Sequence, residues 1–295
     1  MADSGIKKVV YQAFLTIAVL GVLCAWHINR TQMTAQAAAE QPGITLPVIM
    51  YHSILKDEAR AGPYVLSPSA LAADLDYLQQ HGYETVTTFD LIEYVDGTGE
   101  LPQKPVLITF DDGFYNNYLY AYPLLKERGM QAVVSVIGEQ TALFTENGQE
   151  NAYWSYLSAG RLTEMQESGV FEIGNHSYAL HTDTPRKGCL KKRGEDAAQY
   201  RDMLTQDTHA AQTLLAESGI TPPVCYAYPY GAYSAETEEI LKEMGFRCTL
   251  SCEERQNKIV RGNPNCLYLL GRYNRPSGVP TTTFFERVFS KEGTT

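Results

Sequence analysis

Two adjacent carboxylates, Asp111 and Asp112, directly follow an apolar run from Pro105 to Phe110 in this chain of 295 residues. Carboxylates this close repel each other, and burial at the end of a strand makes their ionisation still more costly. A bound cation would remove that cost. Because Asp-Gly is also a common turn sequence, the pair by itself leaves a turn and a cation site as alternatives.

Two histidines, His176 and His181, follow a second apolar segment and lie five residues apart. On a helix this spacing would separate the rings by about 140°, and on a strand it would place them on opposite faces. The two rings can therefore converge only in a loop, which residues 182–185 (Thr-Asp-Thr-Pro) favour. Two imidazoles and one carboxylate are typical of a catalytic metal site that keeps a position open for water. Surface or core filling is the alternative for each histidine alone.

The elements that must position these residues alternate along the chain. We expect strands at 46–51, near 86, and at 105–110, 131–137, 171–174, 224–228, 246–250 and 267–270, with helices at 68–82, 89–95, 117–128, 159–168, 195–218 and 235–244. The helix after Ser67 has a clear start, since serine is a preferred N-cap and Pro68 suits the first helical position. This alternation predicts a barrel-like α/β domain.

Polar residues stand where several of these strands end. In α/β folds the chemistry takes place at the carboxyl ends of the strands. The residues expected there are His52, Asp111 to Gly113, Asn175 and His176, Pro229 to Gly231, and Arg272. Three of the six histidines fall in this set or just beyond it. We therefore expect these side chains to share one pocket.

Three segments of the chain resemble the motifs of NodB-type polysaccharide deacetylases (carbohydrate esterase family 4). Thr109 to Gly113 (TFDDG) resembles the first motif, His176 to His181 (HSYALH) the second, and Tyr228 to Gly231 (YPYG) the third. The resemblance covers about residues 46–275. It implies a distorted (β/α)7-type barrel as a single catalytic domain, which we place at residues 46–295.

The chain departs from the family pattern in ways that point to one of its branches. The histidines of the second motif are five apart rather than four, and Ala227 stands where the third motif usually has Arg. The Asp-Trp of the fourth motif is missing, and no histidine follows His209. This pattern is similar to the circularly permuted poly-β-1,6-N-acetylglucosamine deacetylases, whose first strand supplies a histidine, and Val48 to Ser53 (VIMYHS) resembles that strand. The resemblance gives His52 the role of general acid.

The resemblance also implies metal-assisted removal of N-acetyl groups from an amino sugar. Asp112, His176 and His181 would hold a divalent ion, zinc or alternatively cobalt, nickel or manganese, since this ligand set suits several ions. Asp111 would act as general base. The products would be acetate and a free amine.

Further residues would contact the substrate. The backbone N–H of Tyr230, after Pro229, would stabilise the oxyanion. Arg272 would pair with Asp111 in place of the missing motif arginine, or would form an ordinary salt bridge. Three tyrosines are candidates for lining the sugar cleft or, alternatively, for ordinary packing: Tyr51, Tyr178 and Tyr228.

The N-terminal residues predict export. Lys7 and Lys8 precede an uncharged run of 18 residues, from Val9 to Trp26, which as a helix would span about 27 Å, close to the thickness of a bilayer core. We expect residues 1–30 to form a signal or anchor segment and residues 31–45 a tether, with the body outside the cytoplasmic membrane. A signal peptide cleaved near Ala37 is the alternative.

Composition limits the remaining possibilities. With 24 basic and 34 acidic residues and a net charge of -10, the chain lacks a general basic surface for nucleic acid. None of the six cysteines forms a CxxC pair, which argues against a finger-type zinc site, and their pairing is left open. The polymer is also left open among peptidoglycan, poly-N-acetylglucosamine, chitin-like oligomers and xylan. A glycan-binding domain without turnover and an acetyl esterase are the competing functions.

Overall fold

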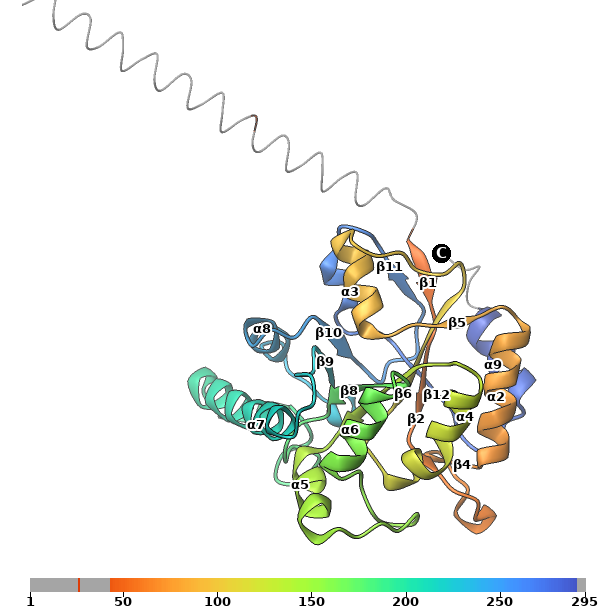
Figure 1. Cartoon of the computed structure of the whole chain (residues 1–295). Coiled ribbons are helices and arrows are strands. Elements are labelled where there is room, and N and C mark those ends of the chain that lie inside the picture. The colour runs from red at the N-terminus through yellow and green to blue at the C-terminus, as the bar shows by residue number, and fades with distance from the viewer. Residues whose placement is uncertain (1–25, 27–42, 291–295) are drawn as a thin grey trace, which may run out of the picture.

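The computed structural model describes Trp26 and residues 43–290, and within them strands and helices alternate (Figure 1). The strands are β1 (Ile44–Leu46), β2 (Val48–Tyr51), β3 (Ser53–Ile54), β4 (Val65–Leu66), β5 (Glu84–Thr85), β6 (Pro105–Phe110), β7 (Ala132–Val136), β8 (Phe171–Asn175), β9 (Cys225–Ala227), β10 (Cys248–Leu250), β11 (Asn257–Ile259) and β12 (Tyr273–Asn274). The α-helices are α2 (Pro68–Gln80), α3 (Thr88–Asp96), α4 (Tyr122–Glu127), α5 (Gly138–Asn147), α6 (Ala159–Glu167), α7 (Ala197–Glu217), α8 (Thr237–Glu243) and α9 (Thr281–Phe289).

The main sheet is parallel and curled into a half-barrel. Its strands follow the order β10-β9-β8-β7-β6-β2-β12, and β5 also pairs with β6. The segment that forms the edge strand β12 also contacts the opposite edge. Leu270 forms a parallel bridge to Leu250 on β10, and Tyr273 on β12 pairs with Ile49 on β2. The predicted α/β class is therefore confirmed, and the two edges of the curl are linked through residues 270–274.

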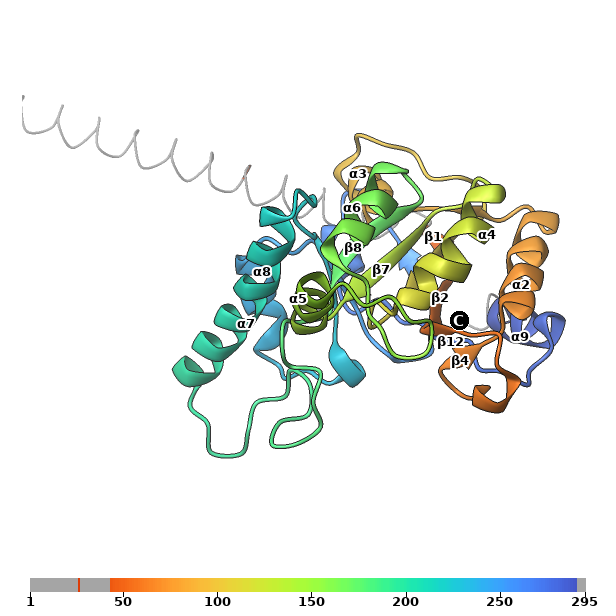
Figure 2. The same cartoon turned by 60° about the horizontal axis from the view of Figure 1, so that its bottom comes forward.

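The core explains why the run from Pro105 to Phe110 is apolar throughout. On β6, Val106, Ile108 and Phe110 pack in a cluster under the helices, whereas Leu107 packs in a second cluster inside the curl. Strands of a parallel sheet covered on both faces show this pattern. The helices surround the sheet, with α2 and α9 on one side and α7 and α8 on the other (Figures 1 and 2).

The sequence prediction was wrong or incomplete at several elements. The last strand is not at 267–270: Leu267 ends a 3-10 helix that starts at Pro264, and the strand is β12. The predicted helix 117–128 begins as a π-helical turn, residues 117–121, before α4. Proline fits this second start, because Pro123 lies in the first turn of α4 where no amide hydrogen bond is lost. Helices α5 and α9 and strand β11 were not predicted.

The predicted signal or anchor segment and tether lie almost wholly outside the described residues. In Trp26 and residues 43–290, no helix is both long and apolar enough to cross a membrane. The described cysteines carry free thiols. Cys248 lies beside Cys225 in the register of β10 and β9, rather than forming a bridge to Cys252.

A buried ion pair joins helix α2 to the C-terminal part of the fold. Asp74 accepts two hydrogen bonds from Arg275, at 2.8 and 3.0 Å, and both side chains are almost fully buried. The hydroxyl groups of Tyr51 and Thr281 donate to the same carboxylate. The pair therefore connects β2, α2, the end of β12 and the start of α9 through one carboxylate.

Replacing Asp74 by Ala should lower the free energy of unfolding by about 3–5 kcal/mol, because the buried Arg275 charge loses its partner. Urea denaturation measures this change. Asp76→Ala is the matched control on the same helix, since Asp76 pairs with Arg128 at the surface and should contribute less than about 1 kcal/mol. Equal losses for the two variants would contradict a special role for the buried pair.

A second buried carboxylate, Glu172 on β8, holds the start of α3. It accepts hydrogen bonds from the backbone N–H and the hydroxyl of Thr88. Burial nevertheless raises the pKa of Glu172 to about 7. The stability that the protonated form provides is complete below pH 4.5, the ordinary pKa of glutamate, and is lost as the pH rises through 7.

Wild-type protein should therefore lose more unfolding free energy between pH 5 and pH 8 than the Glu172→Gln variant, by up to about 3 kcal/mol. Glutamine stays neutral over this range and keeps the size of the side chain. Urea denaturation of both proteins at the two pH values measures the difference. Parallel pH profiles would show that Glu172 titrates normally in the folded protein.

Candidate active site

The carboxyl ends of β2, β6, β8 and β9 bring the predicted residues into one cleft. It has a volume of about 830 Å³, and its walls include His52, Asp111, Asp112, His176 and His181. In Figure 2, which brings the lower end of the molecule forward, the loops after β3, α5 and β8 lie at this end. The prediction that these five residues share a pocket is confirmed.

Three of these side chains gather closely enough to hold one ion. Oδ1 of Asp112 lies 3.6 Å from Nε2 of His176 and 3.1 Å from Nε2 of His181. One ligand atom from each residue lies within 4.8 Å of the other two. The two histidines, five residues apart, converge through a loop, as the spacing predicts.

The hydrogen bonds around this cluster suit a cation. Nδ1 of His176 lies 2.8 Å from the carbonyl oxygen of Ala227. Because that oxygen can only accept, Nδ1 carries the proton and the lone pair of Nε2 faces the cluster. Oδ1 of Asp112 is buried without a hydrogen bond of regular geometry. A nitrogen oriented from behind and a buried, unsatisfied carboxylate oxygen fit a divalent metal ion.

Burial and charge set the protonation of the two imidazoles. Burial lowers the pKa of His176 and outweighs the nearby carboxylates, which keeps the ring neutral as a metal ligand requires. Burial also disfavours a charged His181, but its contact with Asp112 outweighs burial and raises the pKa. A metal ion would therefore compete with a proton at His181.

Backbone conformation aims the residues at the strand ends. Four non-glycine residues in the described part have φ in the left-handed region, and three belong to this site: Asp112 at 70°, Ser177 at 70° and Tyr230 at 58°. Such conformations cost energy and tend to occur at functional sites. At Asp112 this turn ends β6, so that two adjacent aspartates face different partners.

Asp111 is held by an arginine and not by the histidines. Nη1 of Arg272 donates to Oδ1 of Asp111 at 2.7 Å, and Nη2 donates to Oδ2 at 2.8 Å. Arg272 is fully buried and Asp111 is 2% exposed. Burial by itself would raise the pKa of Asp111, but the charge and hydrogen bonds of Arg272, together with contributions from the neighbouring histidines, lower it overall. The predicted pairing is present, but Arg272 lies behind Asp111 and not in the cleft wall.

His52 lies at the end of β2, where its ring meets the edge of Tyr64 with 4.8 Å between the ring centres. Its backbone carbonyl accepts a hydrogen bond from Nδ2 of Asn117 at 2.7 Å. Burial lowers the pKa of His52, and its Nδ1 has no hydrogen-bond partner. The side chain is thus a neutral imidazole in the cleft wall, free to exchange a proton with a bound molecule.

The third predicted motif forms another part of the cleft wall. Pro229 is buried, whereas Tyr230 lines the cleft and is 44% exposed. The ring of Tyr230 packs against His181 with 4.5 Å between ring centres. Tyr230 is therefore within reach of anything bound beside the histidines.

The other three candidate tyrosines do not line the cleft, so that the alternative of ordinary packing holds for them. Tyr51 and Tyr228 are buried in the core, where Tyr51 donates to Asp74, and Tyr178 packs against Gly138. Alternation along a strand could have indicated that Tyr51 and His52 face opposite ways. The cleft takes its tyrosines from loops instead, at Tyr64 and Tyr153 beside the predicted Tyr230, positions that no periodic pattern indicates.

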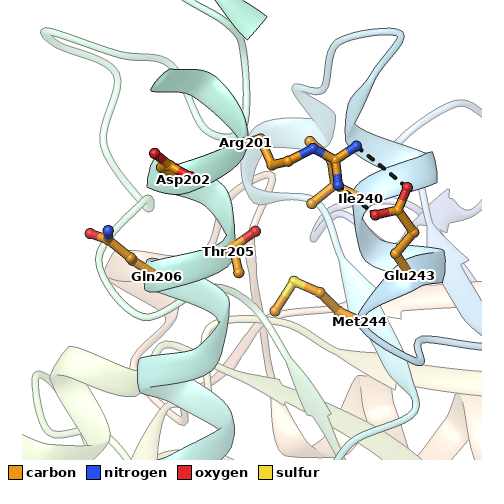
Figure 3. A pocket seen from close by; sticks show the side chains of 7 residues that line it. All are labelled: Arg201, Asp202, Thr205, Gln206, Ile240, Glu243 and Met244. Carbon is orange, nitrogen blue, oxygen red and sulfur yellow. Dashed lines mark hydrogen bonds and ion pairs between the residues drawn. The ribbon is translucent and has the colours of Figure 1, made fainter. Parts of the chain in front are cut away.

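A second hollow, of about 460 Å³, lies between α7 and α8 (Figure 3). Arg201 and Glu243 pair across it above Ile240 and Met244. Its lining includes no histidine and no cysteine. The cluster of residues with catalytic potential lies in the first cleft.

Comparison with known proteins gives a consistent family. Residues 98–249, just over half of the chain, match the model of the polysaccharide deacetylase family. The protein YxkH of Bacillus subtilis (strain 168) is 26% identical over 254 residues, which cover 85% of this chain and 78% of that protein. Poly-beta-1,6-N-acetyl-D-glucosamine N-deacetylase of Staphylococcus aureus (strain MSSA476) is 25% identical over 207 residues, covering 70% of this chain and 66% of that enzyme.

Solved structures share the fold. IcaB from Ammonifex degensii superposes with a TM-score of 0.67 at 28% identity, over 84% of this chain and 97% of the IcaB chain. The curled parallel sheet with its surrounding helices is thus a NodB-like fold. The chain belongs to the polysaccharide deacetylase family and is a hydrolytic N-deacetylase.

Proposed function

We propose that this protein uses a divalent metal ion to remove N-acetyl groups from a polymer of N-acetylglucosamine units. The observation that carries the proposal is that two adjacent aspartates have different partners. Asp112 faces two imidazole nitrogens, whereas Asp111 faces a buried arginine. A binding module would need the first arrangement but has no use for a second, fixed carboxylate beside it.

Asp112, His176 and His181 would hold the ion, and zinc is the leading candidate for this ligand set. When bound, such an ion acidifies a water molecule and polarises a carbonyl group. The protein supplies the rest of the chemistry through side chains that are already positioned.

Asp111 would accept the proton of the attacking water. The pKa of Asp111 is lowered, because the charge and hydrogen bonds of Arg272 and the neighbouring histidines together outweigh burial. The carboxylate is therefore ionised throughout the neutral range. Each of its oxygens accepts one hydrogen bond from Arg272, which leaves a further lone pair on each for water. The arginine therefore fixes the base without blocking it.

In its protonated form His52 would deliver a proton to the amide nitrogen, since an amine leaves far more readily than an amide anion. The proton that Asp111 accepts from the water replaces this proton in the overall balance. The bond between the acetyl carbon and the nitrogen then breaks, giving acetate and a free glucosamine unit. The backbone N–H of Tyr230 would donate to the developing oxyanion. Each turnover adds one ionisable amine to the polymer.

The relatives support the substrate class. The similar enzyme of Staphylococcus aureus is a poly-beta-1,6-N-acetyl-D-glucosamine N-deacetylase. We also propose that residues 1–30 place the catalytic domain outside the cytoplasmic membrane, as an anchor or as a signal peptide cleaved near Ala37, followed by a tether at residues 31–45. In that position the domain would have access to polysaccharides of the cell surface.

Asp111→Asn should reduce kcat for acetate release from N-acetylglucosamine oligomers by about 10²- to 10⁴-fold, because the base is lost. Metal content should not change, since Asp111 is not among the proposed ligands. Acetate assays and elemental analysis of the same samples check both expectations, with circular dichroism to verify folding. Full activity in this variant would remove Asp111 from the mechanism.

Dialysis against a chelator should abolish acetate release, and adding back zinc or cobalt should restore it. His181→Ala should weaken zinc binding, measured by calorimetry, by more than the roughly 10- to 100-fold that loss of an outer-shell partner costs. His209→Ala is the control, because that histidine is exposed on α7. Unchanged zinc affinity after His181→Ala would rule out the proposed ligand set.

A further inference from the structure

Two exposed tyrosines occupy the part of the cleft next to His52. Tyr64, in the loop between β3 and β4, is 59% exposed, and Tyr153, in the loop between α5 and α6, is 49% exposed. Both line the cleft that contains the catalytic residues. Figures 1 and 2 show the loop after α5 reaching towards the β3–β4 loop. Large exposed aromatic rings in a functional cleft indicate a binding surface.

A buried asparagine joins the two loops to the catalytic strand. Nδ2 of Asn116 donates to Oγ of Ser53 and to the carbonyl oxygen of Ala152, each at 2.9 Å. Oδ1 of Asn116 accepts from the backbone N–H of Ile54 at 2.9 Å. Because Ser53 follows His52 and Ala152 precedes Tyr153, one side chain fixes the distance between the candidate acid and the tyrosine loop.

Further contacts hold the two rings. The guanidinium of Arg60 lies over the ring of Tyr153, 5.2 Å from its centre, and Tyr64 packs against His52. The backbone N–H of Tyr115 donates to Ser155 at 2.8 Å, which ties the Tyr153 loop to the strand-end turn of β6. These contacts hold the two rings in place before a ligand binds. Less side-chain and loop entropy is therefore lost on binding.

We propose that Tyr64 and Tyr153 form a stacking wall for the sugar units that neighbour the one being deacetylated, so that the enzyme prefers oligomers to short substrates. This inference rests on the proposed function, because it assigns further subsites to the same cleft. Pyranose rings present C–H faces that pack on aromatic rings, and their hydroxyl groups can bond to Arg60 or to the tyrosine hydroxyl groups. The wall lies on the His52 side, so it would also set the direction of the chain across the site.

The test compares N-acetylglucosamine oligomers of two and five units. Tyr153→Ala should raise KM for the pentamer by about three- to tenfold, as expected for loss of one aromatic contact, and should leave kcat and the dimer kinetics unchanged. Tyr153→Phe should behave like the wild type, because it keeps the ring. Trp154→Ala is the matched control: Trp154 is also 49% exposed, packs on Phe144 and is not part of the cleft lining.

Calorimetric titration of the pentamer separates this inference from the proposed function. In one outcome, the wild type binds the pentamer without releasing acetate, and Tyr153→Ala weakens that binding. This result would support the stacking wall and contradict the proposed reaction. If acetate were released but Tyr153→Ala and Trp154→Ala matched the wild type in KM and affinity at both lengths, the wall would be overturned and the reaction would remain. A KM increase for dimer and pentamer alike would also overturn the wall as a distal subsite.

Discussion

The ion pair between Asp111 and Arg272 is the interaction on which the site depends. Both side chains are buried and the bond is bidentate, so each charge has the other as its main partner. A buried arginine without its carboxylate would be strongly destabilising. Arg272 also donates through Nε to the carbonyl oxygen of Ser251, just beyond the end of β10. The pair therefore joins β6 in the middle of the sheet to the segment that connects its two edges.

Two neighbouring residues of the same type acquire different chemistry from this arrangement. Asp111 continues the inward face of β6, where Leu107 and Thr109 also point, and so meets the arginine. The left-handed φ of Asp112 ends the strand, and its carboxylate meets the two histidines. Backbone geometry, and not residue type, decides which carboxylate becomes a candidate ligand and which a candidate base.

The sequence predicted those parts of the molecule that follow periodic rules. The apolar run of β6 and the N-cap at Ser67 were found, because burial on two faces and helix starts leave local patterns. The convergence of His52, Asp111 and His176 followed from the topology of parallel strands. The cleft residues Tyr64 and Tyr153 were missed, because they lie in loops, where no periodic pattern indicates which side chains face the cleft. The last strand was misplaced because the apolar residues 267–270 pack in the core without forming a ladder.

The candidate catalytic residues are widely separated along the chain, which limits where a recombinant form of the domain can be cut. The stretch that matches the family model, residues 98–249, contains Asp112 and both histidines. It omits His52, which comes before it, and Arg272, which comes after it. A recombinant fragment cut to those limits would contain the three candidate metal ligands but lack the candidate proton donor, and it would leave Asp111 without its counter-charge. Because Asp111 and Arg272 are 161 positions apart, the candidate centre is complete only once the chain has been synthesised and folded beyond Arg272.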